Sequence, residues 1–118
     1  MILSAILVSV LAAPALADSY PVSGDWGQSS STKPGPIDCN GKRVISFNGN
    51  QRTDSNGGVP AYRNKSVTQV GSSYRVTDEF TNGQVNDATT SYTLHQLDAD
   101  HIEMNLQSGG TLTLQRCK

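Results

Sequence analysis

The two histidines of the chain, His95 and His101, flank the sequence Asp98-Ala99-Asp100, whose composition is typical of a tight turn. If the flanking residues form a hairpin, both imidazoles project from one outward face, with His95 opposite Glu103. Imidazole and carboxylate groups are ligands that Zn²⁺ and Cu²⁺ accept. His95, His101 and Glu103 are therefore a candidate metal site. The spacing matches no established ligand motif, however, which favours an ordinary polar strand face.

Groups for other kinds of catalysis are sparse. The chain contains no Gly-x-Ser-x-Gly motif, and we expect both cysteines to be bonded to each other. Asp78 and Glu79 are neighbours, so on a strand they point to opposite faces and cannot act as a carboxylate pair. We therefore expect a protein that is not an enzyme and that needs no cofactor. A small metal-dependent hydrolase at the histidine hairpin is an alternative.

Asp78 is a candidate ligand anchor. It lies between Val76 and Phe80 in an alternating run, so its side chain falls on the inward face of the expected strand. A buried carboxylate requires a partner and can orient a ligand inside a cavity. The interpretation we favour is a strand end at the rim of the fold, where water reaches the carboxylate.

Residues 1–17 have the character of a signal peptide. They are almost wholly apolar, carry no charge and end in Ala15-Leu16-Ala17, a small-x-small pattern that signal peptidases recognise. The apolar run is short for a transmembrane helix. We therefore expect one domain over residues 18–118, a secreted or periplasmic location, and no membrane insertion of the mature form.

Charge and cysteine content narrow the class further. Nine basic and ten acidic residues nearly cancel and form no blocks, which argues against nucleic acid as a partner. Cys39 and Cys117 lie 78 positions apart, and in an oxidising compartment we expect them to form a disulfide. In the chain-entropy view, a bridge over such a loop stabilises the fold by roughly 4–5 kcal/mol.

The turn signals and the residues between them predict an all-β fold. Asn-Gly pairs, which favour tight turns, recur along the chain, and β-branched residues and tyrosines fill the runs between them. We expect a small antiparallel meander that closes, or nearly closes, into a barrel of about seven or eight strands with one disulfide. The expected strands include residues 22–28, 43–48, 65–70 and 73–80.

In the last third of the chain, apolar residues occupy even-numbered positions, which predicts the hairpin register. A three-residue loop at Asp98-Ala99-Asp100 pairs Leu94 with Met104. A three-residue loop at Ser108-Gly109-Gly110 pairs Leu106 with Leu112.

The connection before these hairpins is less regular. A tight turn at Asn82-Gly83 would pair Phe80 with Val85 and bring odd-numbered residues inward, against the even-numbered pattern that follows. We expect a bulge or a longer connection near residues 88–90 to resolve this conflict.

Gly24-Asp25-Trp26 and Arg116 resemble the signature of lipocalin-type (calycin) barrels. The resemblance implies that Arg116, on the last strand, stacks on Trp26, on the first; our register places Arg116 opposite Ile102. Length and export make the chain most similar to the small periplasmic metalloprotease inhibitors. That resemblance implies an N-terminal segment that threads into a protease cleft.

These observations favour an exported non-enzymatic binding protein that acts through protein–protein contact, such as inhibition of a secreted or host enzyme. A short chain favours a barrel filled by its own side chains, and exposed aromatic residues are natural anchors for a protein partner. Tyr20, ahead of the first expected strand, and Tyr62, in a polar segment, are the candidate partner-binding residues. A small-ligand carrier is a further alternative.

Overall fold

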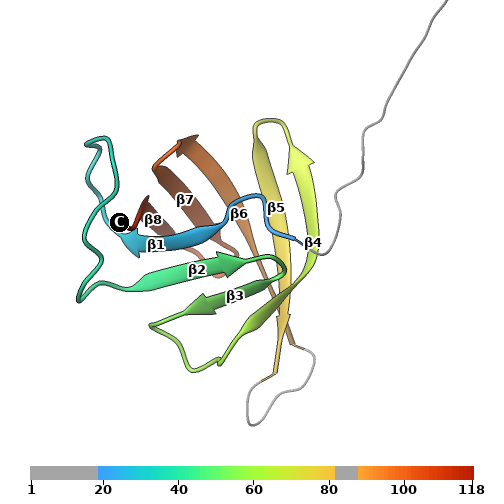
Figure 1. Cartoon of the computed structure of the whole chain (residues 1–118). Helices are drawn as coiled ribbons and strands as arrows, with labels where there is room; N and C mark the ends of the chain where they lie inside the picture. The colour runs from blue at the N-terminus through green and yellow to red at the C-terminus, as the bar shows by residue number, and fades with distance from the viewer. Residues whose placement is uncertain (1–18, 82–87) are drawn as a thin grey trace, which may run out of the picture.

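The computed structural model describes residues 19–81 and 88–118 and shows a closed barrel of antiparallel strands (Figure 1). The expected signal peptide, residues 1–17, lies outside the described residues. No helix among the residues described is long and apolar enough to cross a bilayer. The strands are β1 (Gly24–Gln28), β2 (Val44–Asn48), β3 (Gln51–Asp54), β4 (Tyr62–Val70), β5 (Ser73–Phe80), β6 (Ala88–Asp98), β7 (His101–Leu106) and β8 (Thr111–Arg116).

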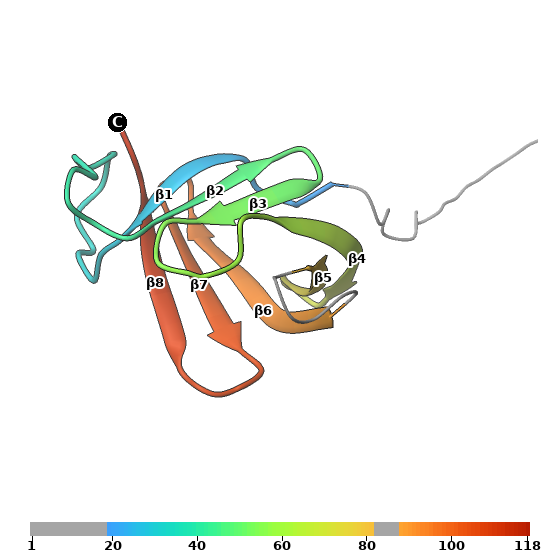
Figure 2. The same ribbon diagram turned by 90° about the horizontal axis from the view of Figure 1, so that it is seen from below.

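Each strand pairs with its neighbour in sequence, and β1 pairs with β8 to close the ring (Figure 2). This confirms the predicted all-β barrel with one disulfide. Inward-facing residues alternate with outward-facing ones, as the pleat of a strand requires. The buried apolar side chains that fill the interior are Tyr20, Val22, Trp26, Ile45, Phe47, Val67, Val76, Tyr92, Leu94, Ile102, Met104, Leu112 and Leu114.

The β6–β7 hairpin has the predicted pairing of Leu94 with Met104. Its turn is tighter than predicted, because Asp98 pairs directly with His101 and the register shifts between Gln96 and Asp98. Leu97 is the extra residue of this bulge, and the residue is 59% exposed. The bulge reconciles a two-residue turn with an even-numbered core face.

The predicted β7–β8 register is wrong by two residues. Met104 pairs with Leu112, and Leu106 lies beside Gly110, whose carbonyl accepts its N–H. Gly109 and Gly110 both have positive φ, at 101° and 93°, so the turn uses both glycines. A shift of two residues keeps every side chain on its face, so the apolar pattern alone does not choose between the two registers.

The connection before β6 is the longer of the two predicted alternatives. Phe80 pairs with Ala88 and not with Val85, and the ladder then runs without a shift to Ser73 and His95. The proposed turn at Asn82-Gly83 lies outside the described residues. Even-numbered positions therefore face inward on both β5 and β6.

A long loop between β1 and β2 is fastened to the outer face of the barrel. Gln115, which is 1% exposed, donates hydrogen bonds to the carbonyls of Lys33 and Gly35 and accepts one from Ser29. The predicted disulfide joins the end of this loop to the end of β8, with 5.6 Å between the Cα atoms of Cys39 and Cys117. The outer face of β8 is therefore covered at Gln115 by the chain itself, while Thr111 at the other end of the strand stays exposed.

Gly27 on β1 lies directly under this disulfide. A Cβ atom at this position would collide with the Cys39 sulfur and lie 3.6 Å from the Cys117 sulfur. We predict that Gly27→Ala lowers the free energy of unfolding by roughly 1–3 kcal/mol, through overpacking. Denaturant unfolding of the oxidised protein measures the loss.

Two controls make this prediction specific. Gly58→Ala adds the same methyl group where no heavy atom lies within 4 Å, and it should leave the stability nearly unchanged. In a Cys39→Ala/Cys117→Ala background, the cost of Gly27→Ala should shrink. An undiminished cost there would contradict the proposed collision.

Candidate functional site

Asp78 lies inside the barrel and not at its rim, which corrects the interpretation we favoured from the sequence. Its carboxylate is fully buried and accepts hydrogen bonds from four side chains. Arg52 Nε lies 2.8 Å and Tyr92 Oη 3.2 Å from one oxygen; Tyr20 Oη lies 2.9 Å and Asn64 Nδ2 3.3 Å from the other. These five residues form what we call the Asp78 cluster.

The Asp78 cluster satisfies its own charges. Burial disfavours the charged guanidinium of Arg52, but Tyr92 and Asp78 act in the opposite direction, and the pKa of Arg52 is raised overall. A carboxylate offers about four lone-pair directions, and four donors from this chain occupy them. Asp78 is therefore not free to anchor a ligand while Tyr20 is in place.

Tyr20 is a member of the core and not the exposed anchor that we predicted. Only 8% of the residue is exposed, and its ring packs edge-on against Phe47 with 5.0 Å between centroids. Its N–H donates to the carbonyl of Gly49. Burial raises the pKa of the Tyr20 phenol, and the nearby charge of Asp78 raises it further. The hydroxyl is therefore fixed as a donor to Asp78.

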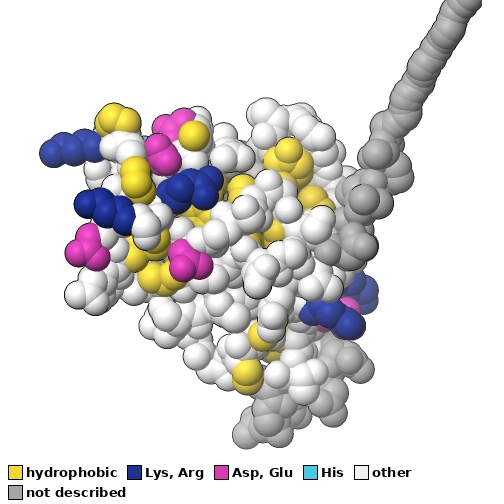
Figure 3. All heavy atoms as spheres, viewed as in Figure 1, with side chains coloured by type: hydrophobic (Ala, Val, Ile, Leu, Met, Phe, Trp, Pro, Cys, Tyr) yellow, Lys and Arg dark blue, Asp and Glu magenta, His cyan; other side chains and the backbone are white. Residues whose placement is uncertain are grey.

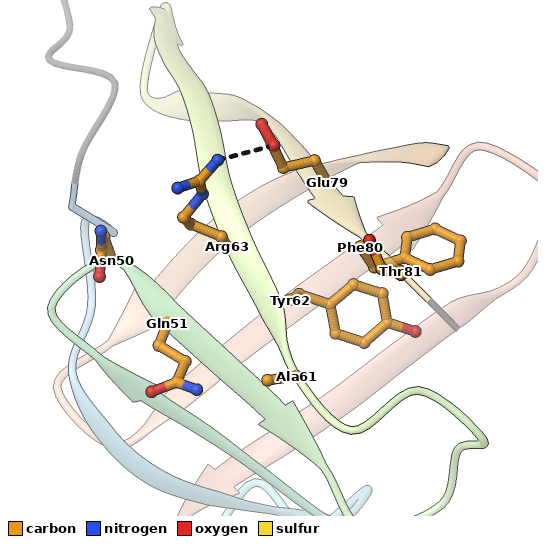
Figure 4. Close-up of a pocket in the computed structure, with 8 residues that line it drawn as sticks. All are labelled: Asn50, Gln51, Ala61, Tyr62, Arg63, Glu79, Phe80 and Thr81. Atoms are coloured by element: carbon orange, nitrogen blue, oxygen red, sulfur yellow. Dashed lines mark hydrogen bonds and ion pairs between the residues drawn. The ribbon is translucent and has the colours of Figure 1, made fainter. Parts of the chain in front are cut away.

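Tyr62, the other predicted partner-binding residue, lines a groove of about 320 Å³ across the start of β4 (Figure 4). The groove is bordered by residues from β3, β4 and β5 and the segments next to them. Its lining residues are Asn50, Gln51, Ala61, Tyr62, Arg63, Glu79, Phe80 and Thr81. Residues of both strand faces line it: Tyr62 and Phe80 have the parity of the inward face, and Gln51, Arg63 and Glu79 have that of the outward face.

The ring of Tyr62 is fixed from two sides. The guanidinium carbon of Arg52 lies 3.9 Å from the ring centroid, and the ring of Phe80 meets it edge-on at 5.3 Å. On the opposite face of the same two strands, Arg63 donates to Glu79 over 2.9 Å, as the dashed line in Figure 4 shows. The same Arg52 therefore contacts the Asp78 cluster and the aromatic ring at the groove.

The candidate metal ligands do not converge. His95 and Glu103 are opposite each other, as predicted, but His95 hydrogen-bonds with Ser73. His101 is buried beside the β1–β2 loop, and its Nδ1 lies 2.7 Å from Asp98. Within residues 19–81 and 88–118, no group of three His, Cys, Asp or Glu side chains is arranged to hold a metal ion.

The contact implied by the lipocalin resemblance is present at the start of β1. The guanidinium of Arg116 lies 4.4 Å from the centre of the Trp26 ring and donates to the carbonyl of Ala99. Trp26 is fully buried, and its indole N–H donates to Ser23. Arg116 pairs with Trp26 across the strands and lies next to Asp100, not opposite Ile102, because of the shifted β7–β8 register.

Sequence reasoning missed three members of the Asp78 cluster in this role. Arg52 lies in Gln51–Asp54, a wholly polar strand that we did not predict. Asn64 precedes a β-bulge that shifts the alternation of β4. Tyr92 belongs to the even-numbered apolar positions predicted to face inward, but nothing local to it indicates a bond to Asp78. Asp78 was the available signal, since an inward carboxylate requires donors from facing strands.

The raised phenol pKa values of the Asp78 cluster predict a loss of stability at alkaline pH. Burial raises the pKa of both Tyr20 and Tyr92 above the ordinary value near 10. Folding therefore favours the protonated phenols, and their contribution is complete below about pH 10 and is lost as the pH rises further. Denaturant unfolding from pH 7 to pH 11 should show this decline.

Tyr20→Phe isolates one of the two phenols. At pH 7 the substitution should lower the free energy of unfolding by roughly 1–3 kcal/mol, because a bond to a buried carboxylate is lost. Its stability should then fall less steeply above pH 10 than that of the unmodified protein. Identical slopes in the two proteins would contradict the assignment.

No protein-family model matches the sequence, and searches of curated proteins and of solved structures found no significant match. The closed eight-strand antiparallel barrel is consistent with a small lipocalin-like barrel.

Proposed function

We propose that this protein is an exported, non-enzymatic binding protein that contacts a protein partner through the groove at Tyr62. The observation that carries the proposal is a half-buried tyrosine held rigidly between Arg52 and Phe80 at the edge of a depression of about 320 Å³. Aromatic side chains that are ordered before binding lose little entropy in a complex and often dominate its energy.

The surroundings of the groove favour a protein over a strongly charged partner. Arg63 and Glu79 neutralise each other, while Asn50 and Gln51 offer amide donors and acceptors. On the face seen in Figure 3, hydrophobic side chains form small separate groups, and most of the remaining described surface consists of backbone and uncharged side chains. A contact built on such a surface would combine a few aromatic anchors with a polar rim.

The disulfide between Cys39 and Cys117 is consistent with an oxidising compartment, and this supports the proposed export. The partner we propose is a secreted or host enzyme that the protein inhibits. The stacking of Arg116 on Trp26 supports a relation to lipocalin-type barrels, and the size of the chain supports one to the small periplasmic protease inhibitors.

The mode of inhibition that we propose differs from N-terminal threading. Tyr20 is anchored to Asp78 by its hydroxyl and to Gly49 by its N–H. With cleavage after Ala17, only Asp18 and Ser19 would precede this anchor, which is too little chain to extend into a cleft. A partner that binds at the groove at Tyr62 leaves both of these bonds of Tyr20 in place.

Capture of a partner tests the proposal. The mature protein, immobilised, is exposed to the exported fraction of its own cells, and the captured protein is then titrated against variants. Tyr62→Ala should weaken the complex by roughly 30-fold or more, as expected for loss of an aromatic hot spot. Ala61→Arg, which fills the groove without removing any contact of Arg52, should weaken it similarly.

The controls separate the groove from the rest of the surface. Lys65→Ala changes an exposed residue of the same strand outside the groove and should leave the affinity unchanged. Deletion of residues 18 and 19, which precede the buried Tyr20, separates N-terminal threading from the groove and leaves the core intact: loss of capture on this deletion would show that the N-terminal segment makes the contact. A complex that survives both groove substitutions, with thermal stability intact, rules the proposal out. If the captured enzyme keeps full activity in the complex, inhibition is excluded.

A further inference from the structure

Tyr20 occupies the Asp78 cluster much as a bound phenol would. It is the member of the cluster that comes from outside the strands: the other four lie on β3, β4, β5 and β6, whereas Tyr20 precedes β1. Figure 1 shows this segment running from the side of β4 and β5 across to β1. The cluster therefore consists of a strand-borne receptor and one phenol brought to it by a connecting segment.

The receptor half does not depend on Tyr20 for its position. Asn64 and Asp78 are direct cross-strand partners, and Val76 and Tyr92 pair in the next ladder. The ion pair of Arg52 with Asp78 joins β3 to β5 across the interior. Without Tyr20, three donors would still surround the carboxylate, and one of its oxygens would keep only the 3.3 Å contact from Asn64.

The contacts of Tyr20 define the chemistry of the site. Its hydroxyl donates to Asp78 over 2.9 Å, and the edge of its ring packs on Phe47. Arg52 already neutralises Asp78, so a second cation is not required, and an anionic ligand would meet the carboxylate. An uncharged aromatic ring with one hydroxyl donor meets these demands, because a ring without the donor leaves a buried acceptor short of a partner.

We propose that the interior of the barrel beside Asp78 is a binding site for small phenols, occupied within this chain by Tyr20. A free phenol binds when the segment before β1 moves and withdraws the Tyr20 side chain from Asp78. While Tyr20 is in place, it excludes the phenol. The site is distinct from the groove at Tyr62, so this proposal goes beyond the proposed function. The apparent affinity of the intact chain for a phenol equals the affinity of the open site multiplied by the fraction of molecules in which Tyr20 has left Asp78.

The experiment removes the Tyr20 side chain from the site beside Asp78 and supplies the same chemical group as a free molecule. Tyr20→Gly removes the phenol, and p-cresol (4-methylphenol) reproduces it. Calorimetry and thermal unfolding should show saturable binding of p-cresol to Tyr20→Gly, with a rising Tm. Toluene, which has the same ring without the hydroxyl, should bind at least about tenfold more weakly.

Two further proteins complete the test. Tyr20→Phe keeps the ring in place and should not respond to p-cresol; the intact protein should bind p-cresol at least about tenfold more weakly than Tyr20→Gly. Ala61→Arg, which blocks the groove, should bind p-cresol no differently when combined with Tyr20→Gly. This last comparison keeps a failure of the phenol site separate from a failure of the groove.

Each outcome decides the proposal. It is overturned if folded Tyr20→Gly does not bind p-cresol, if toluene binds equally well, or if the intact protein binds p-cresol as tightly as the variant does. If Tyr20→Gly does not fold alone, refolding is carried out with p-cresol or toluene present. Recovery of native protein with p-cresol but not with toluene supports the phenol site. Failure with both compounds, or equal recovery with both, refutes it.

Discussion

An ion pair inside the barrel, between Arg52 and Asp78, is the constraint on which the rest of the interior depends. Both side chains are almost completely removed from water, at 6% and 0% exposure, and burial of two charges is costly unless each is neutralised and hydrogen-bonded. Three further donors complete the hydrogen bonding of the Asp78 carboxylate. The centroids of the Tyr62 and Tyr92 rings lie 3.9 and 5.1 Å from the guanidinium carbon of Arg52. Removal of any one partner leaves a buried group unsatisfied, so this pair restricts how β3, β4, β5 and β6 can be arranged.

The same pair connects the core to the surface. Arg52 contacts Asp78 on one side and supports the ring of Tyr62 on the other, so the order of the candidate groove originates inside the barrel. The opposite part of the structure is held by different contacts. Arg116 stacks on Trp26. The Cys39–Cys117 disulfide and the hydrogen bonds of Gln115 fasten the long loop to β8. This division leaves the β3–β5 side to present the groove and the β7–β8 side to close the fold.

Much of the architecture could be predicted from the sequence, because period-two alternation and glycine-rich turns act over short distances. The strand over residues 73–80, the pairing of Leu94 with Met104 and the disulfide were all predicted. The β7–β8 register was not, because a shift of two residues keeps the same face inward. β3 was missed because all four of its residues are polar and both of its inward-parity residues, Arg52 and Asp54, are charged. The Asp78 cluster joins residues far apart in sequence, and only the folded barrel determines which donors meet the carboxylate.

A double-mutant cycle on Arg52 and Asp78 tests this account most directly. The free energy of unfolding is measured for Arg52→Met, for Asp78→Asn and for the double variant at pH 7. Each single change should cost about 3–5 kcal/mol, because it leaves the other group buried without its partner. The double variant should cost clearly less than the sum, by about 2 kcal/mol or more. Costs that add to within about 0.5 kcal/mol would contradict the central role of the pair.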